Sequence, residues 1–114
     1  MKLNPEEANF ISIFVRKLKT GKTYEDFKKN WFPDKPFPIP VRVINSININ
    51  DKSEILSVGF LKINEDEFDD VLNKISVQES VRHERISDVI EKTELKAIYR
   101  IVDDYNLDDL TKNI

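Results

Sequence analysis

The chain has 114 residues, enough for one domain that buries a core without disulfides or a structural metal. It contains no cysteine, which excludes disulfides, cysteine-ligated zinc and thiol catalysis. With 21 acidic and 18 basic residues its net charge is −3, whereas nucleic-acid-binding domains are usually basic. We therefore expect a single domain, residues 1–103 followed by a polar C-terminal tail, residues 104–114, and no nucleic-acid partner.

The N-terminal segment is acidic and leads into a short apolar run that begins at Phe10. Arg16 interrupts this run after six residues, so it is neither a signal peptide nor a membrane span. We expect a cytoplasmic protein that does not associate with membranes. Residues 1–50 carry a net charge of +4 and residues 51–114 one of −7. The two signs either interleave on folding or make the surfaces of two copies complementary.

The first strand is predicted over residues 9–19, which are rich in β-branched and aromatic side chains. Its alternate residues form two different faces. One face is wholly apolar and the other is mixed. The apolar face carries Ile11, Ile13 and Val15, and the mixed face carries Phe10, Ser12, Phe14 and Arg16.

A short helix is predicted next, with Thr23 as its N-cap and Asp26 three residues later. Tyr24, Phe27 and Trp31 lie on one face of it, which favours packing against the sheet over a ligand cage. Residues 32–40 hold four of the five prolines and predict a stiff, extended connector that buries Phe37. A lid, or a ligand for proline-recognition modules, is the alternative for this segment.

Residues 41–64 predict a β-hairpin that turns at residues 51–52. With that turn, residue 49 pairs with 54, 47 with 56, 45 with 58 and 43 with 60. The predicted core face carries Val41, Val43, Asn45, Ile47, Ile49, Leu56, Val58 and Phe60. The predicted mixed face carries Arg42, Ile44, Ser46, Asn48, Ile55, Ser57, Gly59 and Leu61.

A second helix is predicted from Asn64, with a buried face formed by Phe68, Val71, Leu72 and Ile75. Ser76 is a further cap signal and predicts a second helical piece over residues 77–85, with Val77 and Val81 inward. Residues 86–93 allow a loop, a helical turn or a bulged segment. The last strand is predicted over residues 94–102, and the tail after it is expected to fray unless a partner subunit holds it.

The element order predicts an α+β, ferredoxin-like β-α-β-β-α-β fold with a four-stranded antiparallel sheet and both helices on one face. The other sheet face is left open. We expect it to carry the mixed residues, including Phe10, Phe14 and Ile44. Large apolar residues gathered on an exposed face usually mark a binding or association surface. A homodimer that pairs through this open face is therefore expected.

The run from Phe14 to Trp31, a strand leading into an aromatic helix, followed by the hairpin, resembles the dimeric α/β-barrel superfamily. The resemblance implies that two ferredoxin-like sheets close face to face into a barrel. That superfamily includes cofactor-independent monooxygenases, haem-degrading enzymes, dehalogenating and decarboxylating enzymes and stress proteins. Its haem-degrading members use an Asn, a Trp and a His in set places that Trp31 and His83 do not match. No catalytic role and no cofactor is therefore implied for this chain.

The polar groups of the mixed face predict a pocket for a small ligand with an apolar body and an acidic or carbonyl oxygen end. Either arginine could instead pair with carboxylates of a partner subunit at the barrel rim. No metal site is predicted, and His83 is expected to be an exposed helix residue. The candidate ligand-binding residues are Phe10, Ser12, Phe14, Arg16, Arg42, Ile44, Ser46, Asn48 and Ser57.

No catalytic motif is evident, so the sequence predicts a small-molecule-binding or structural protein, and whether it is an enzyme stays open. The first alternative is a cofactor-independent monooxygenase or lyase that acts on a small aromatic or polyketide-like substrate. The second is an RNA-recognition domain, which shares the element order. Of the motif on the third strand of such domains only Gly59-Phe60 is present.

Overall fold

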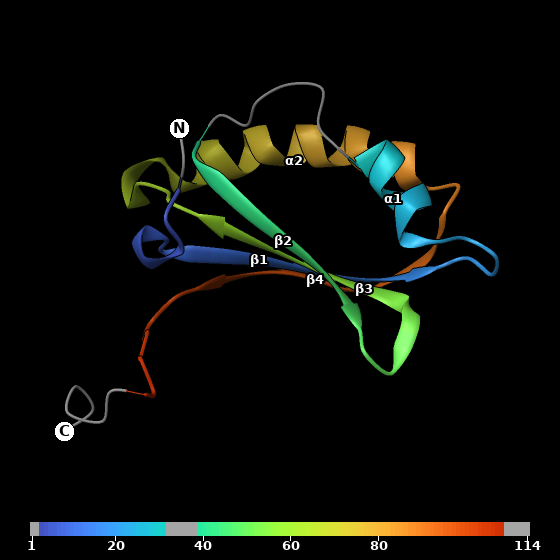
Figure 1. The fold of residues 1–114 in the computed structure, drawn as a ribbon. Coiled ribbons are helices and arrows are strands. Elements are labelled where there is room, and N and C mark those ends of the chain that lie inside the picture. The colour runs from blue at the N-terminus through green and yellow to red at the C-terminus, as the bar shows by residue number, and fades with distance from the viewer. Residues whose placement is uncertain (1–2, 32–38, 109–114) are drawn as a thin grey trace.

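The computed structural model describes residues 3–31 and 39–108. Its strands are β1 (Phe10–Leu18), β2 (Val41–Asn48), β3 (Asp51–Leu61) and β4 (Ile90–Arg100), and its α-helices are α1 (Tyr24–Trp31) and α2 (Phe68–Ile86). Two short 3-10 helices, η1 (Pro5–Glu7) and η2 (Glu65–Glu67), precede β1 and α2. The strands form an antiparallel sheet in the order β2-β3-β1-β4, and both α-helices cover one face of it (Figure 1). The predicted ferredoxin-like fold is confirmed.

The N-terminus of α1 is capped as predicted. The Thr23 amide donates to Asp26 Oδ2 at 2.9 Å, and the Asp26 amide donates to Thr23 Oγ1 at 3.4 Å. Phe27 and Trp31 of this helix are buried and stack with ring centroids 6.0 Å apart. The predicted proline-rich connector and Phe37 lie outside the described residues, except for Ile39 and Pro40.

Helix α2 is one continuous element, and the predicted break at Ser76 is wrong. Ser76 lies in the interior of this helix, with helical residues on both sides, so it does not begin a second helix. Its carbonyl accepts a hydrogen bond from the Ser80 hydroxyl one turn later. Val77 and Val81, predicted to face inward, are 68% and 51% exposed. Strand β4 begins at Ile90, four residues before the predicted start.

The predicted hairpin register is wrong by one residue. Val43 pairs with Gly59, Asn45 with Ser57 and Ile47 with Ile55. The turn lies at residues 49–50, where the Asn50 amide donates to Asn48 Oδ1, and a register shift follows between Ile47 and Asn48. A one-residue slip moves every side chain of a strand to the other face. The predicted core residues of β3 therefore face away from the helices; they are Leu56, Val58 and Phe60. The predicted mixed residues of β3 face the helices instead; they are Ile55, Ser57, Gly59 and Leu61.

The faces of β1 are also the reverse of the expected ones. Phe10, Arg16 and Leu18 are buried beneath the helices, and the register places Ile11 and Ile13 on the open face. Phe10, Phe14, Ile55 and Leu61 are thus not exposed on that face, contrary to prediction. The open face is instead predominantly apolar. Its apolar residues are Ile11, Ile13, Val15, Ile44, Leu56, Val58, Phe60, Leu95 and Tyr99.

The core between sheet and helices consists of two clusters. One joins Leu18, Ile55, Ile86 and Val89 to the aromatic pair of α1. The other joins Phe10, Leu61, Ile63 and Val71 at the opposite end of the sheet. No helix in the described ranges is long and apolar enough to cross a membrane. The same residues contain no group of three or more acidic or histidine side chains arranged to hold a metal.

The hairpin is anchored to β1 by Lys17, which contacts Asp51 and lies 3.7 Å from Glu54. The hydrogen bond from Lys17, followed by those from Ser53, lowers the pKa of Asp51 to about 2. Since a free aspartate has a pKa of about 4, these contacts favour the folded state above about pH 4, and this contribution is lost as the pH falls toward 2.

We therefore expect Asp51→Asn to flatten the acid dependence of stability. Between about pH 4 and 2 its free energy of unfolding, from urea denaturation, is expected to fall less than that of the parent protein. Asp104→Asn, in the exposed C-terminal segment, is the matched control and should follow the parent. An identical acid dependence of the two variants would contradict the assignment.

Candidate functional site

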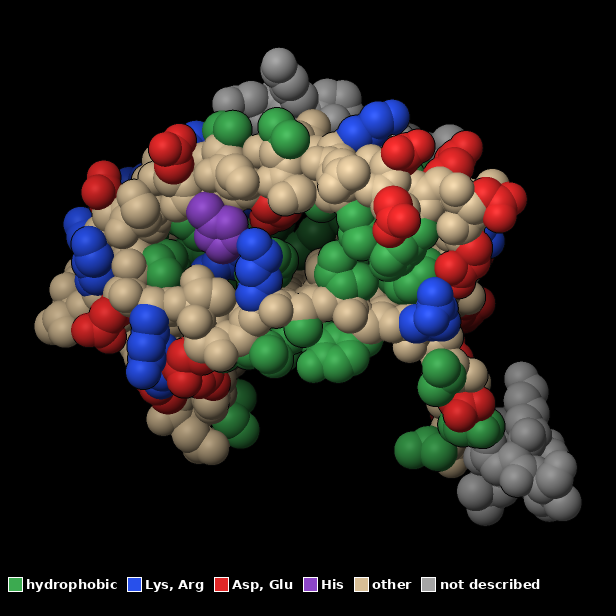
Figure 2. Space-filling model, turned by 180° about the vertical axis from the view of Figure 1, so that it is seen from behind, with side chains coloured by type: hydrophobic (Ala, Val, Ile, Leu, Met, Phe, Trp, Pro, Cys, Tyr) green, Lys and Arg blue, Asp and Glu red, His purple; other side chains and the backbone are tan. Residues whose placement is uncertain are grey.

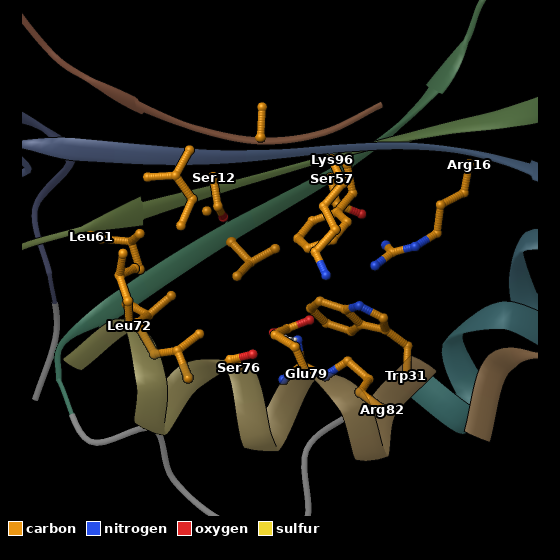
Figure 3. Close-up of a pocket in the computed structure, with 17 residues that line it drawn as sticks. Ser12, Arg16, Trp31, Ser57, Leu61, Leu72, Ser76, Glu79, Arg82 and Lys96 are labelled. Atoms are coloured by element: carbon orange, nitrogen blue, oxygen red, sulfur yellow. Dashed lines mark hydrogen bonds and ion pairs between the residues drawn. The ribbon is translucent and has the colours of Figure 1, made fainter. Parts of the chain in front are cut away.

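A cavity of about 360 Å³ lies between the sheet and α2 (Figure 3). This volume is at the lower end of the range for small-molecule sites, about 300–1,000 Å³. Figure 2 shows the cavity from behind as a hollow between the helix layer and the sheet. All four strands, α2 and the last residue of α1 contribute to its wall. The cavity is therefore on the helix side of the sheet, opposite to the open face on which the site was predicted.

The cavity is apolar at one end and charged at the other. Leu61 and Leu72 lie at the apolar end, with Val41 and Ile75 also in the wall (Figure 3). Toward the other end the side chains are polar or charged and come from both layers. They are Arg16, Ser57, Ser76, Glu79, Arg82 and Lys96, together with the indole of Trp31.

Arg16 is the most deeply buried charge of the site. Because alternate residues of β1 face the helices, its side chain enters the interior and is only 1% exposed. Its guanidinium carbon lies 4.2 Å from the centroid of the Phe14 ring. Within the described part of the chain, neither Nε nor Nη1 has a hydrogen-bond partner. Burial lowers the pKa of Arg16 to about 10, against the attraction of Glu79, so the group stays cationic at neutral pH.

Glu79 enters the cavity from α2, on the opposite wall. Its Oε1 accepts a hydrogen bond of 2.9 Å from Arg82, whose guanidinium carbon lies 4.8 Å from the centroid of the Trp31 ring. The pKa of Arg82 is lowered by burial, with Glu79 opposing this shift. The other carboxylate oxygen of Glu79, Oε2, is buried and has no partner among the described residues. The ion pair with Arg82 thus holds the Glu79 carboxylate in place and leaves its Oε2 available to accept a hydrogen bond.

The strand wall of the cavity has a close approach between β1 and β3. A Cβ atom placed on Gly59 would lie 2.6 Å from Ser12 Oγ, so a larger residue there would displace the Ser12 hydroxyl. Two residues away, the Ser57 side chain is buried, and its Oγ has no partner in the described ranges. The strands therefore contribute a second unsatisfied polar group besides Arg16.

His83 is not the exposed helix residue that we predicted. It is partly buried, and its ring centroid lies 5.6 Å from that of Phe14. The histidine side chain lies at the rim of the hollow in Figure 2. Burial, followed by the positive charges of Arg16, Lys96 and Arg82, lowers the pKa of His83 below 6.5. His83 is therefore neutral at pH 7.

Of the nine predicted site residues, the structure brings four together around the cavity: Ser12, Phe14, Arg16 and Ser57. Phe10 lies in the core instead, 4.7 Å from the ring of Phe68. The other four are alternate residues of β2 and lie on the open face; they are Arg42, Ile44, Ser46 and Asn48. There the Asn48 side chain donates a hydrogen bond to Glu54.

Glu79, Arg82 and Lys96 were not predicted as site residues, and for Trp31 a place in the core was favoured over a ligand cage. The sequence does contain a signal for the two helix residues. Positions 68, 72, 75, 79, 82 and 86 follow one face of α2, and its first three and last residues are apolar. Charged residues at 79 and 82 interrupt this face where it should be dry, which indicates a polar site beneath the helix.

No protein-family model and no curated protein matches the chain. A solved structure does resemble it: "putative Antibiotic biosynthesis monooxygenase from Chloroflexus aurantiacus J-10-fl". The two align with a TM-score of 0.57 and 11% identity over 85% of this chain and 96% of the other. The chain shares the fold of that protein. At this level of identity the comparison supports the predicted fold alone.

Proposed function

We propose that this protein binds a small acid with an apolar body in the cavity between the sheet and α2. The observation that carries the proposal is Arg16, a cation 1% exposed with two unpartnered nitrogens among the described residues. Buried polar groups are nearly always hydrogen-bonded, to protein, water or ligand. A carboxylate would accept hydrogen bonds from the guanidinium, and the apolar end would hold the rest of the ligand.

The charges around the cavity support an anionic ligand. Arg16, Arg82 and Lys96 are positive, and Glu79 is the only acidic residue in the wall formed by the described residues. The site therefore carries an excess of positive charge in a partly buried environment. Charge–charge attraction is stronger there than in bulk water, so a single negative charge on the ligand is favoured.

The test compares Arg16→Gln with Arg42→Gln, which removes the same charge from the open face. The probe is 2-naphthoate, titrated by calorimetry, with the uncharged ketone 2-acetylnaphthalene as a second ligand. Since hydrogen bonds to charged groups contribute about 1.5–3 kcal/mol, we expect Arg16→Gln to weaken naphthoate binding about ten- to a hundredfold.

Arg42→Gln should bind naphthoate like the parent protein, and the ketone should bind Arg16→Gln and the parent alike. An unchanged naphthoate affinity in Arg16→Gln would contradict the proposal. An equal loss in both arginine variants would contradict it as well, because the effect would then not arise from the cavity.

We also propose that two copies pair through their open sheet faces. The support is the apolar character of that face, where Ile44, Leu56 and Tyr99 are 43%, 37% and 48% exposed. Residues 101–108 leave the end of β4 and run out on the side of the sheet opposite the helices (Figure 1). Val102 and Leu107 in this segment are 81% and 77% exposed. A partner subunit on the open face would cover both, with residues 104–114 acting as a tail to the domain of residues 1–103.

A second candidate is a cofactor-independent monooxygenase or lyase that acts on a small aromatic or polyketide-like substrate. Its support is the fold shared with a protein described as a monooxygenase, together with two proton acceptors. They are Glu79 in the cavity wall and the neutral His83, which contacts the cavity residue Phe14. Incubation with quinol-type substrates under air tests this candidate. Oxygen uptake that Glu79→Gln abolishes would favour the enzyme, and its absence would leave binding alone.

A further inference from the structure

We infer that Glu79 is a specificity-determining residue, and that the ligand is a hydroxy acid, or another acid that carries an O–H or N–H donor at a second position. This inference rests on the proposed binding of an acid at Arg16. It adds a second polar group to the ligand and assigns a residue to recognise it.

The first step is the arrangement of two opposite charges across the cavity. Arg16 projects from β1 and Glu79 from α2, so they enter the space from facing walls (Figure 3). Each has atoms without a partner within the described residues, Nε and Nη1 of Arg16 and Oε2 of Glu79. They attract each other, but no hydrogen bond joins them in the described part of the chain. The gap between them therefore needs a group that both accepts and donates.

The second step is the chemistry that each wall demands. Arg16 offers only donors, so the group nearest to it is an acceptor such as a carboxylate. Ionised Glu79 offers only acceptors, so it needs a donor, and a second carboxylate beside it would be repelled. Its Oε1 is already held by Arg82 at 2.9 Å, which leaves Oε2 as the atom that a ligand hydroxyl would donate to.

The third step is selectivity. A plain acid that satisfied Arg16 would leave Oε2 of Glu79 desolvated and unpaired, which is unfavourable for a buried charged atom. A site with a buried hydrogen-bonding group rejects analogues that lack the complementary group much more strongly than a site with an apolar wall does. Glu79 therefore favours hydroxy acids over acids of the same size without a donor.

The experiment uses matched naphthoates on the full-length protein. Binding of 2-naphthoate is compared by calorimetry with binding of its 1-, 3- and 6-hydroxy derivatives and of 6-methoxy-2-naphthoate, which keeps an oxygen but has no donor. We expect at least one hydroxy acid to bind about tenfold more tightly than 2-naphthoate, and the methoxy acid to show no gain.

Glu79→Gln keeps an amide oxygen for Arg82 and removes the charge at the second atom, so it should reduce the preference for the hydroxy acid to about threefold or less. Glu84→Gln, on the exposed side of α2, is the matched control and should keep the preference. Thermal melting of both variants shows whether they fold. If Glu79→Gln does not fold, Glu79→Asp serves as the second variant.

The outcomes separate this inference from the proposed function. If 2-naphthoate binds through Arg16 but every hydroxy acid binds like it, the acid site stands and the role of Glu79 is overturned. The same follows if the hydroxy acid keeps its advantage in Glu79→Gln. If no naphthoate binds, the proposed function itself fails, and this inference with it.

Discussion

Replacement of Trp31 with alanine is expected to lower the free energy of unfolding by about 3–5 kcal/mol, the usual cost of removing a large aromatic side chain from a core. Trp31 is 8% exposed and belongs to the cluster that holds α1 and α2 against the sheet. One neighbour is the Phe27 ring, at 6.0 Å and an interplanar angle of 27°, and another is the guanidinium of Arg82. Alanine would remove both contacts and leave a cavity.

The measurement is urea denaturation followed by circular dichroism, because the variant lacks the chain's single tryptophan. Trp31→Phe is the control, since a smaller aromatic ring retains part of the packing against Phe27 and should cost clearly less. Trp31 also forms part of the cavity wall. If Trp31→Ala abolished naphthoate binding with an unchanged free energy of unfolding, the residue would serve the site and not the core.

Introduction of a charge on the open sheet face is expected to separate the two subunits of the proposed dimer. Val58 lies near the middle of that face, opposite Ile13 on β1 and Ile44 on β2. An aspartate buried there without a partner costs on the order of several kcal/mol, and the subunits avoid this cost by dissociating. We therefore expect the parent protein to sediment at about twice the chain mass of 13.4 kDa, and Val58→Asp at the chain mass.

Val77→Asp provides a matched control for this experiment, because Val77 is 68% exposed on α2 and lies outside the proposed contact. It should sediment like the parent protein. Sedimentation equilibrium at tens of micromolar distinguishes the species. A parent protein that is monomeric at this concentration would contradict pairing through the open face.

The order and type of the elements were predictable because each is encoded locally. The β-branched run of β1, the capping pair before α1 and the apolar stripe of α2 depend on residues a few positions apart. The orientation of the strands was not predictable in this way. We assigned the more apolar face of β1 to the core, but Ile13 lies on the open face and Arg16 is buried. The assumption that the more apolar face of a strand faces the core fails for β1, because its helix side lines a cavity and its other side is apolar.

The site was only partly predictable for the same reason. Ser12, Phe14 and Arg16 were grouped correctly, because alternation within one strand is reliable. Arg42 and Ser46 were added through a predicted hairpin register that differs by one residue from the observed register. In the observed register Ser57 lies opposite Asn45 on the helix side of the sheet, so it lines the cavity. Glu79 was missed because charged residues on a helix are usually exposed, and only the sheet opposite it shows that this part of α2 faces inward.

The most direct test of the acid site is a crystal structure of the protein with 2-naphthoate at saturating concentration. We predict electron density for the ligand between the sheet and α2, with its carboxylate within hydrogen-bond distance of the Arg16 guanidinium and its rings toward Leu61 and Leu72. Density on the open sheet face beside Arg42, with an empty cavity beneath α2, would contradict the proposed site.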